Sequence, residues 1–147
     1  MLQNFRHQIT VDIRFSDMDA MGHVNNAVYM TYMEAGRIHY FRDLDIFHDR
    51  FERHIGPILA KSTIDYRLPL TLDDNPVAVY TRCSRLGNKS YEMEHLIVRN
   101  SNGKPEIAAQ GLMILVAFDY TIDKSVLLPH AWREQITAYE PALNKTP

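Results

Sequence analysis

The chain has 147 residues, close to the commonest domain size and enough for one hydrophobic core but not comfortably for two. Hydrophobic residues make up 46% and charged residues 23%, as in ordinary globular proteins, so a largely disordered chain is excluded. The formal net charge of −2 provides no overall basic field, which argues against a nucleic acid or an anionic membrane as partner. We therefore expect one folded domain over residues 1–147.

Cys83 is the only cysteine, so an internal disulfide and a thiolate metal cluster are excluded, and a buried, inert thiol is expected. The histidines are scattered without a His-x-x-x-His pair, and no metal site is predicted. The N-terminal residues lack the apolar core of a signal peptide, and no apolar run reaches the roughly 18 to 20 residues of a membrane span. These features are typical of a cytoplasmic protein.

The first elements are a strand, a loop and a long helix. Alternating hydrophobic and polar residues predict a half-buried strand over residues 7–15, and the short polar side chains of residues 16–22 predict a loop. Asn25 or Asn26 can cap the helix that follows, and apolar residues at helical spacing extend it to about Asp43.

The first half of this helix, residues 27–36, carries almost no charge, which predicts a buried helix. Such a helix is too apolar to be covered by a single small sheet, which suggests dimerisation. Arg37 is expected to pair with Glu34 or with an acid across that interface. Residues 44–54 are predicted to form a second helical piece or an irregular turn that ends at Gly56 and Pro57.

Four further strands are predicted from alternating hydrophobicity and turn residues. They cover residues 58–68, 77–86, 89–99 and 106–118. Gly87 and Asn88 close one hairpin, and Asn102 with Gly103 makes the next turn. Because the strand over residues 106–118 is apolar on both faces, we expect it at the centre of the sheet.

Pro129 can open a terminal helix that reaches about Tyr139, and the polar tail of residues 140–147 is expected to fray. The domain core then spans about residues 7–135. One long helix followed by a strand meander is typical of the α+β class, in which an antiparallel sheet of about five strands curls around one central helix.

The loop before the long helix holds the candidate chemistry. Asp17, Asp19 and His23 lie within seven residues and directly precede a helix start, whose unpaired amides attract negative charge. Such amides can stabilise an oxyanion while a carboxylate attacks a carbonyl or deprotonates a water. A thioester suits this equipment because its thiol leaves easily. The same residue types serve more often as turn and cap formers, so their spacing alone favours the structural interpretation and leaves the chemical one open.

Residues 14–29, RFSDMDAMGHVNNAVY, and residues 32–37, YMEAGR, resemble the signature of the 4-hydroxybenzoyl-CoA thioesterase-like hotdog family. The likeness extends over about residues 7–135. It implies a hotdog fold and a thioester hydrolase. It also implies Asp19, the second acid of the Asp-x-Asp pair, as nucleophile or general base, and the backbone amide of Asn26 or its neighbours as the group that polarises the thioester carbonyl.

The stretch His23-Val-Asn-Asn26 departs from the hydroxybenzoyl branch and resembles fatty acyl-CoA and plant acyl-carrier-protein thioesterases. Their catalytic histidine matches His23, whereas Met21 stands where they have a catalytic asparagine. The resemblance therefore implies a medium-chain or long-chain fatty acyl-CoA as substrate. His23 is a candidate for orienting water, or for a structural hydrogen bond at the helix start.

Coenzyme A is expected as part of the substrate, with no separate cofactor. Lys89 and Ser90 match family positions near the coenzyme, while Arg82 and Arg85 are added for their charge on the same hairpin. Tyr29 and Met33 are candidates for lining an acyl tunnel, although such residues at helical spacing more commonly belong to a core.

Three other functions compete with acyl-CoA hydrolysis. They are hydrolysis of an acyl-carrier-protein thioester, dehydration or hydration of an acyl thioester on the same fold, and non-catalytic binding of acyl-CoA. The Asp-x-Asp-x-x-Gly-His loop argues against the dehydratase. We expect a homodimer, assembled further as a dimer of dimers into a homotetramer.

Overall fold

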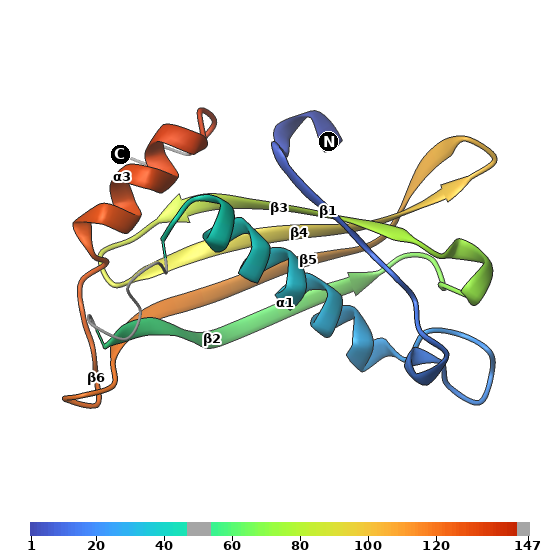
Figure 1. Ribbon diagram of the computed structural model, residues 1–147, viewed down its shortest axis with the longest axis horizontal. Helices are drawn as coiled ribbons and strands as arrows, with labels where there is room; N and C mark the ends of the chain where they lie inside the picture. Colours follow the sequence, from blue (N-terminus) through green and yellow to red (C-terminus); the bar gives the residue numbers. More distant parts are fainter. Residues whose placement is uncertain (47–53, 144–147) are drawn as a thin grey trace.

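The structure, a computed structural model, describes residues 1–46 and 54–143 and has one antiparallel sheet with a long helix against one face (Figure 1). The strands follow the order β1-β3-β4-β5-β2 across the sheet, and β6 also pairs with β5. The described strands are β1 (His7–Val11), β2 (Ile55–Tyr66), β3 (Val77–Leu86), β4 (Ser90–Ser101), β5 (Lys104–Asp119) and β6 (Lys124–Ser125). The helices are α1 (Asn26–Asp43) and α3 (His130–Tyr139), with short 3-10 turns η1 (Leu2–Asn4), η2 (Phe15–Asp17) and η3 (Leu72–Asp74). The predicted α+β architecture, a sheet curled around one central helix, is confirmed.

Helix α1 begins and ends where the sequence predicts. Asn25 is its cap, because the Asn25 side chain accepts a hydrogen bond of 2.9 Å from the Ala27 amide. The helix packs on β1, β3 and β4. At Gly36 a Cβ would lie only 2.6 Å from Thr81 Oγ1, so the missing side chain is what allows the helix to approach β3 this closely.

One side of α1 is not covered within the chain. Tyr32, Met33 and Tyr40 face the core, whereas Thr31 and Glu34 are exposed. The single sheet covers only one face of the helix, as the sequence predicts, and the other face is left uncovered in the single chain. The predicted pairing of Arg37 with Glu34 is confirmed, with 3.8 Å between the guanidinium and the carboxylate.

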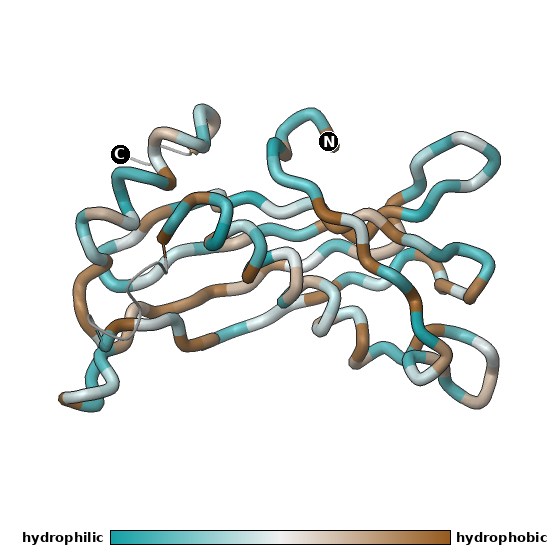
Figure 2. Tube along the Cα trace, viewed as in Figure 1, coloured by the Kyte–Doolittle hydropathy of each residue, from teal (hydrophilic) through white to brown (hydrophobic). Residues whose placement is uncertain are grey.

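The two predicted hairpins are confirmed. Gly87 and Asn88 lie between β3 and β4, and Asn102 and Gly103 adopt the positive φ values of 52° and 80° that their turn requires. Figure 2 shows hydrophilic residues at this second turn and hydrophobic segments along the strands. Strand β5 lies between β4 and β2, as its apolar faces predict.

The first strand is shorter than predicted. It ends at Val11, and Phe15, expected on its buried face, starts η2 with 85% of its surface exposed. Between them the Ile13 amide donates a hydrogen bond of 2.6 Å to the Asn75 side chain rather than to a neighbouring strand. This bond to a distant loop is a contact that local alternation does not reveal.

Strand β2 forms one edge of the sheet and departs most from expectation. It starts at Ile55 and includes Gly56 and Pro57, because an edge position tolerates a proline. A bulge between Leu59 and Lys61 interrupts its alternation. The segment predicted over residues 44–54 lies largely outside the described residues.

Helix α3 follows Pro129 and ends at Tyr139, as predicted. Glu140, the first residue of the tail that is expected to fray, is instead buried: its Oε1 accepts hydrogen bonds from the Tyr40 hydroxyl (2.8 Å) and the Cys83 amide (3.0 Å). Burial nevertheless raises the pKa of Glu140. Residues 144–147 lie outside the described part of the chain. Neither helix drawn in Figure 1 is both long enough and apolar enough to cross a membrane.

Candidate active site

Residues 17–25 form a closed loop between η2 and α1. Met18 and Val24 pair as an isolated antiparallel bridge, and the Asp19 amide donates a hydrogen bond of 2.7 Å to the His23 carbonyl. The tight return uses Gly22 at a φ of 78°. A further hydrogen bond of 2.8 Å, from the Val24 amide to the Leu70 carbonyl, ties the loop to the chain beyond β2. The loop therefore holds its side chains at fixed positions beside the start of α1.

Asp17 is a structural residue of this loop. It is 2% exposed, and its carboxylate accepts hydrogen bonds from the Arg14 amide (2.9 Å), the Arg14 guanidinium (2.9 Å) and the Tyr32 hydroxyl (2.7 Å). Burial alone would raise the pKa of Asp17, but these hydrogen bonds and the Arg14 charge outweigh it and hold the pKa below its usual value. An acid so fully bonded is ionised and unavailable to a substrate.

Asp19 is exposed, and its two carboxylate oxygens differ. Oδ1 accepts hydrogen bonds from the Met21 amide (2.9 Å) and the His23 amide (3.1 Å), which fix the orientation of the side chain. Oδ2 receives no hydrogen bond from residues 1–46 or 54–143. The second oxygen is therefore available to attack a carbon or to accept a proton.

The start of α1 offers a matching donor. The Ala27 amide is taken by the Asn25 side chain, and the Val28 amide donates to the Asn25 carbonyl. The Asn26 amide has no acceptor in the part of the chain that the structure describes. This amide is one of the unpaired helix-start donors that favour negative charge.

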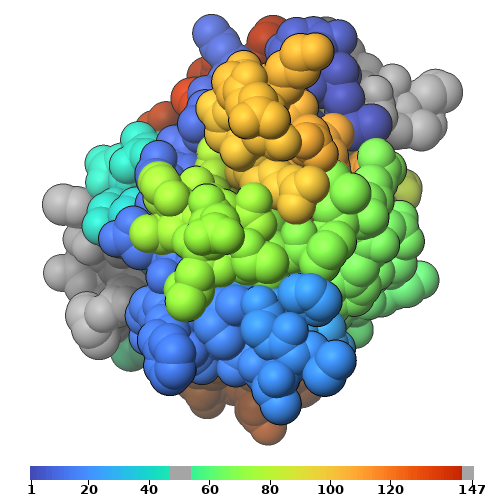
Figure 3. Space-filling model, turned by 90° about the vertical axis from the view of Figure 1, so that its right-hand side faces the viewer, coloured from blue at the N-terminus to red at the C-terminus, as the bar shows by residue number. Residues whose placement is uncertain are grey.

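One pocket of about 370 Å³ brings these groups together. It lies between the loop, the first turn of α1 and the chain that follows β2, and Figure 3 shows these segments, in blue and green, meeting at one end of the molecule. Its lining includes the predicted residues Asp19, His23, Asn26 and Tyr29. The structure thus places four of the predicted site residues around one space.

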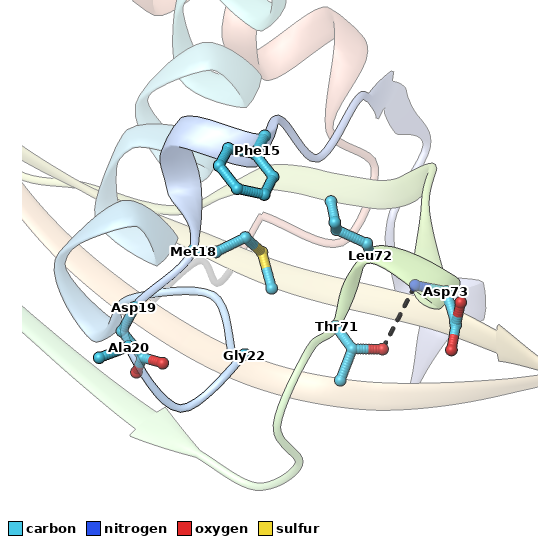
Figure 4. A pocket seen from close by; sticks show the side chains of 8 residues that line it. All are labelled: Phe15, Met18, Asp19, Ala20, Gly22, Thr71, Leu72 and Asp73. Atoms are coloured by element: carbon cyan, nitrogen blue, oxygen red, sulfur yellow. Dashed lines mark hydrogen bonds between the residues drawn. The ribbon is translucent and has the colours of Figure 1, made fainter.

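A second hollow of about 610 Å³ is also lined by Asp19 (Figure 4). Phe15 and Met18 from the loop side and Leu72 from η3 gather around it, with Asp19 at its rim. Asp19 therefore lines both open spaces.

The residues predicted for coenzyme binding lie elsewhere in the chain. Ser90 is level with Val116 and Ile58 across the sheet, whereas the pocket meets β2 at its other end, near Tyr66. The eight positions from Ile58 to Tyr66 correspond to about 26 Å at ~3.3 Å per residue. Lys89 and Ser90 are therefore not beside the Asp19 of their own chain.

Three other predicted site residues have structural partners. Arg82 forms a hydrogen bond of 2.7 Å with Glu94, and Arg85 lies 3.4 Å from Glu92, so the hairpin is not a free cationic cluster. Met33 is fully buried and packs against Gly111 rather than lining either pocket. The structure therefore places Met33 in the core of the single chain, where the sheet lies directly against it.

Sequence reasoning missed Tyr66 and Arg67, which line the pocket with Asp19. The Tyr66 hydroxyl donates a hydrogen bond of 3.0 Å to the Asn26 carbonyl, and Arg67 donates one of 2.7 Å to the Gln110 side chain. Both residues follow Asp19 by more than 40 positions, and no local motif marks them.

Burial raises the pKa of the Cys83 thiol to about 12, so Cys83 stays protonated and is a poor nucleophile, as expected. Across residues 1–46 and 54–143, His, Cys, Asp and Glu side chains do not form a group of three or more that could hold a metal ion.

Comparison with known proteins identifies the family of the chain. The model of the thioesterase-like superfamily matches residues 13–136. A thioesterase from Thermus thermophilus, solved in complex with coenzyme A and zinc, is 39% identical, with a TM-score of 0.80 over 95% of this chain and 97% of that one. These matches include the loop and most of the sheet.

Two curated relatives are more distant. The long-chain acyl-CoA thioesterase FadM of Escherichia coli is 26% identical over 88% of this chain and 96% of its own length. The chloroplastic acyl-acyl carrier protein thioesterase ATL3 of Arabidopsis thaliana is 28% identical over 90% of this chain and 68% of its own length. Taken with the fold and the acid-bearing helix start, these findings show that the chain belongs to the thioesterase-like superfamily and is a hotdog-fold thioester hydrolase.

Proposed function

We propose that the protein hydrolyses a medium-chain or long-chain fatty acyl-CoA to the free acid and coenzyme A. The observation that carries this proposal is the pairing of a free Asp19 Oδ2 with an unpaired Asn26 amide in one pocket. The coenzyme is part of the substrate, and the chemistry needs only groups of the protein and water.

In the proposed reaction the thioester carbonyl oxygen lies against the Asn26 amide, which stabilises the negative charge that develops on it. Asp19 Oδ2 then either attacks the carbonyl carbon or removes a proton from an attacking water. Collapse of the tetrahedral intermediate breaks the carbon–sulfur bond and releases the thiolate. In the first route, water subsequently hydrolyses the acyl-aspartyl anhydride. His23, which lines the same pocket, orients the water.

The choice of substrate is supported by sequence likeness. Residues 23–26 depart from the hydroxybenzoyl pattern, and one relative is named a long-chain acyl-CoA thioesterase. The likeness to a chloroplastic acyl-carrier-protein thioesterase makes a carrier-bound acyl chain the second candidate. Parallel assays with one acyl chain on coenzyme A and on a carrier protein distinguish the two.

The test of the main proposal is thiol release from short-chain, medium-chain and long-chain acyl-CoAs, with a benzoyl-CoA comparison. The proposal requires that the protein hydrolyses a fatty acyl-CoA faster than benzoyl-CoA. It also requires that Asp19→Asn loses this hydrolytic activity. Absence of thiol release from every thioester would refute it, whereas full activity of Asp19→Asn would move the site elsewhere.

We propose further that the working unit is a homodimer joined through β2. This strand leaves one edge unpaired within the described chain, and its Ile58 and Leu59 are 37% and 40% exposed. An open edge with exposed apolar side chains is a ready site for pairing with a second copy. A twofold axis at this edge would set the far end of one chain beside the Asp19 pocket of the other. The same edge-to-edge contact leaves the outer face of the sheet for a dimer of dimers.

This arrangement gives the Lys89 and Ser90 hairpin a route to the coenzyme of the neighbouring copy. Mixing Asp19→Asn protein with Lys89→Ala protein tests it by subunit exchange. If sites are shared, each mixed dimer contains one site with both Asp19 and Lys89, and activity rises above the sum of the separate proteins. The double variant Asp19→Asn/Lys89→Ala mixed with the parent is the control, and light scattering against the chain mass of 17.1 kDa gives the number of copies.

A further inference from the structure

Two tyrosines join the end of β2 to the first turn of α1. The Tyr66 hydroxyl on the strand donates to the Asn26 carbonyl of the helix over 3.0 Å. In return, the Tyr29 hydroxyl on the helix donates to the Leu68 carbonyl beyond the strand over 3.3 Å. Their rings meet edge to face with centroids 5.1 Å apart. The two bonds run in opposite directions and form a reciprocal clasp.

The clasp adds to the Val24–Leu70 hydrogen bond a second link between the start of α1 and the chain at the end of β2. Helix α1 rests mainly on β1, β3 and β4, whereas β2 lies at the opposite edge of the sheet, beyond β5. Tyr66 is the last residue of β2, and both tyrosines line the pocket that holds Asp19. These two side chains, together with the Val24–Leu70 hydrogen bond, therefore hold the helix start against the chain at the end of the edge strand.

Tyr66 bonds to Asn26, the residue whose backbone amide is the proposed donor to the thioester oxygen. Tyr66 holds the Asn26 carbonyl, and the unpaired Asn26 amide belongs to the same residue. A carbonyl oxygen has two lone pairs, so this bond adds to the helical bonding of the first turn without replacing it. An oxyanion donor acts only when it is fixed in advance at the correct distance from the developing charge.

We infer that Tyr66 is a positioning residue of the hydrolytic site, which fixes the Asn26 amide against Asp19 and links its placement to strand β2. This inference rests on the proposed function. Tyr66 acts through Asn26 and not on the reacting atoms, so its loss affects the transition state more than substrate binding.

The variant Tyr66→Phe tests the role of the hydroxyl because it keeps the ring contact with Tyr29. We expect kcat to fall about three- to tenfold, the effect of one hydrogen bond on a rate, with KM within about twofold of the parent. Tyr66 is 49% exposed, so water can replace the lost donor at the Asn26 carbonyl. The thermal midpoint and the oligomeric mass should therefore stay at the parent values.

Tyr120→Phe is the matched control. The Tyr120 hydroxyl also donates to a backbone carbonyl of β2, that of Pro57 over 3.2 Å, and the side chain is 57% exposed. It acts at the opposite end of the same strand. We expect Tyr120→Phe to keep the kcat of the parent. Tyr66→Ala, which also removes the ring, should lower kcat more than Tyr66→Phe does.

The outcomes separate this inference from the proposed function when Asp19→Asn is measured in the same assay. A parent that releases no thiol overturns both. An active parent, an inactive Asp19→Asn and an unchanged Tyr66→Phe overturn only the role of Tyr66. Equal losses of kcat in Tyr66→Phe and Tyr120→Phe also overturn it, since they indicate a general effect on the strand. A rise in KM with an unchanged kcat overturns it as well, since it indicates an effect on substrate binding.

Discussion

The Tyr32 hydroxyl donates a hydrogen bond of 2.7 Å to Asp17 Oδ2, and this contact separates the roles of two acids that stand two positions apart. Asp17 is buried and holds the loop to α1, whereas Asp19 is exposed and keeps one oxygen free. The same stretch of sequence therefore contains both a structural and a chemical carboxylate.

We predict opposite effects for the two amide substitutions. Asp19→Asn should lower kcat by about 10² or more, because a neutral amide neither attacks nor accepts a proton efficiently, with little change in the unfolding midpoint. Asp17→Asn should cost about 1 to 3 kcal/mol of stability, because it breaks a bonded pair with Arg14. Thiol release and urea unfolding of the same samples measure both quantities. Equal losses of activity at equal stability would contradict the division of roles.

The lowered pKa of Asp17 predicts an acid-labile contribution to stability. Because the carboxyl binds its proton less readily in the folded state, its contribution is fully present above the unfolded pKa and is lost as pH falls through the folded pKa. Urea unfolding from pH 6 to pH 2.5 should show the difference between the parent and Asp17→Asn narrowing below about pH 4. A difference that is constant over this range would show that the Asp17 charge is not involved.

Gly36→Ala should destabilise the protein although alanine favours helices by about 1 kcal/mol. Its Cβ would lie 2.6 Å from Thr81 Oγ1 and 2.8 Å from Val79 Cγ1, and both are stiff, buried side chains. We expect a net loss of about 1 to 2 kcal/mol from overpacking, measured by thermal unfolding. Ala35→Gly, at the neighbouring half-buried position, reports the helix propensity alone. A Gly36→Ala protein more stable than the parent would show that α1 can move away from β3.

The contribution of Glu140 to the stability of the fold should change with pH in the opposite direction to that of Asp17. Burial is the chief cause that raises the pKa of Glu140 in the folded state, so the folded protein binds this proton more readily than the unfolded chain does. The free energy of unfolding should therefore rise as the pH falls through the folded pKa toward the ordinary value near 4.5. Glu140→Gln keeps the acceptor for Tyr40 and Cys83 and should remove this dependence without loss of stability at pH 7.5. Glu140→Ala should cost about 2 to 4 kcal/mol, because it leaves two buried donors without a partner. If Glu140→Gln and Glu140→Ala unfold alike, the two hydrogen bonds contribute nothing.

The parts of the fold that the sequence predicts are those decided by neighbouring residues. The Asn25 cap and the spacing of Tyr29, Met33 and Tyr40 define α1 locally, and the two hairpins depend on turn residues at their tips. The edge position of β2 is decided by pairing with β5, about 50 residues later, and no pattern within β2 reveals it.

The same distinction applies to the site. The structural role of Asp17 depends on Tyr32, which reaches back from the helix, and the spacing of the two acids does not reveal this contact. Tyr66 reaches the pocket through the tertiary fold. The acidic partners of Arg82 and Arg85, Glu94 and Glu92, lie on the adjoining strand, and the local charge of the hairpin does not reveal these pairs.

The loop of residues 17–25 is fastened at both of its ends and in its middle by backbone hydrogen bonds before any substrate arrives. A substrate therefore meets a surface that has already lost its conformational entropy, and binding energy is not spent on ordering the loop. Amide hydrogen exchange at Asp19 and Val24 should accordingly be slow in the free enzyme and change little when a thioester or product occupies the site.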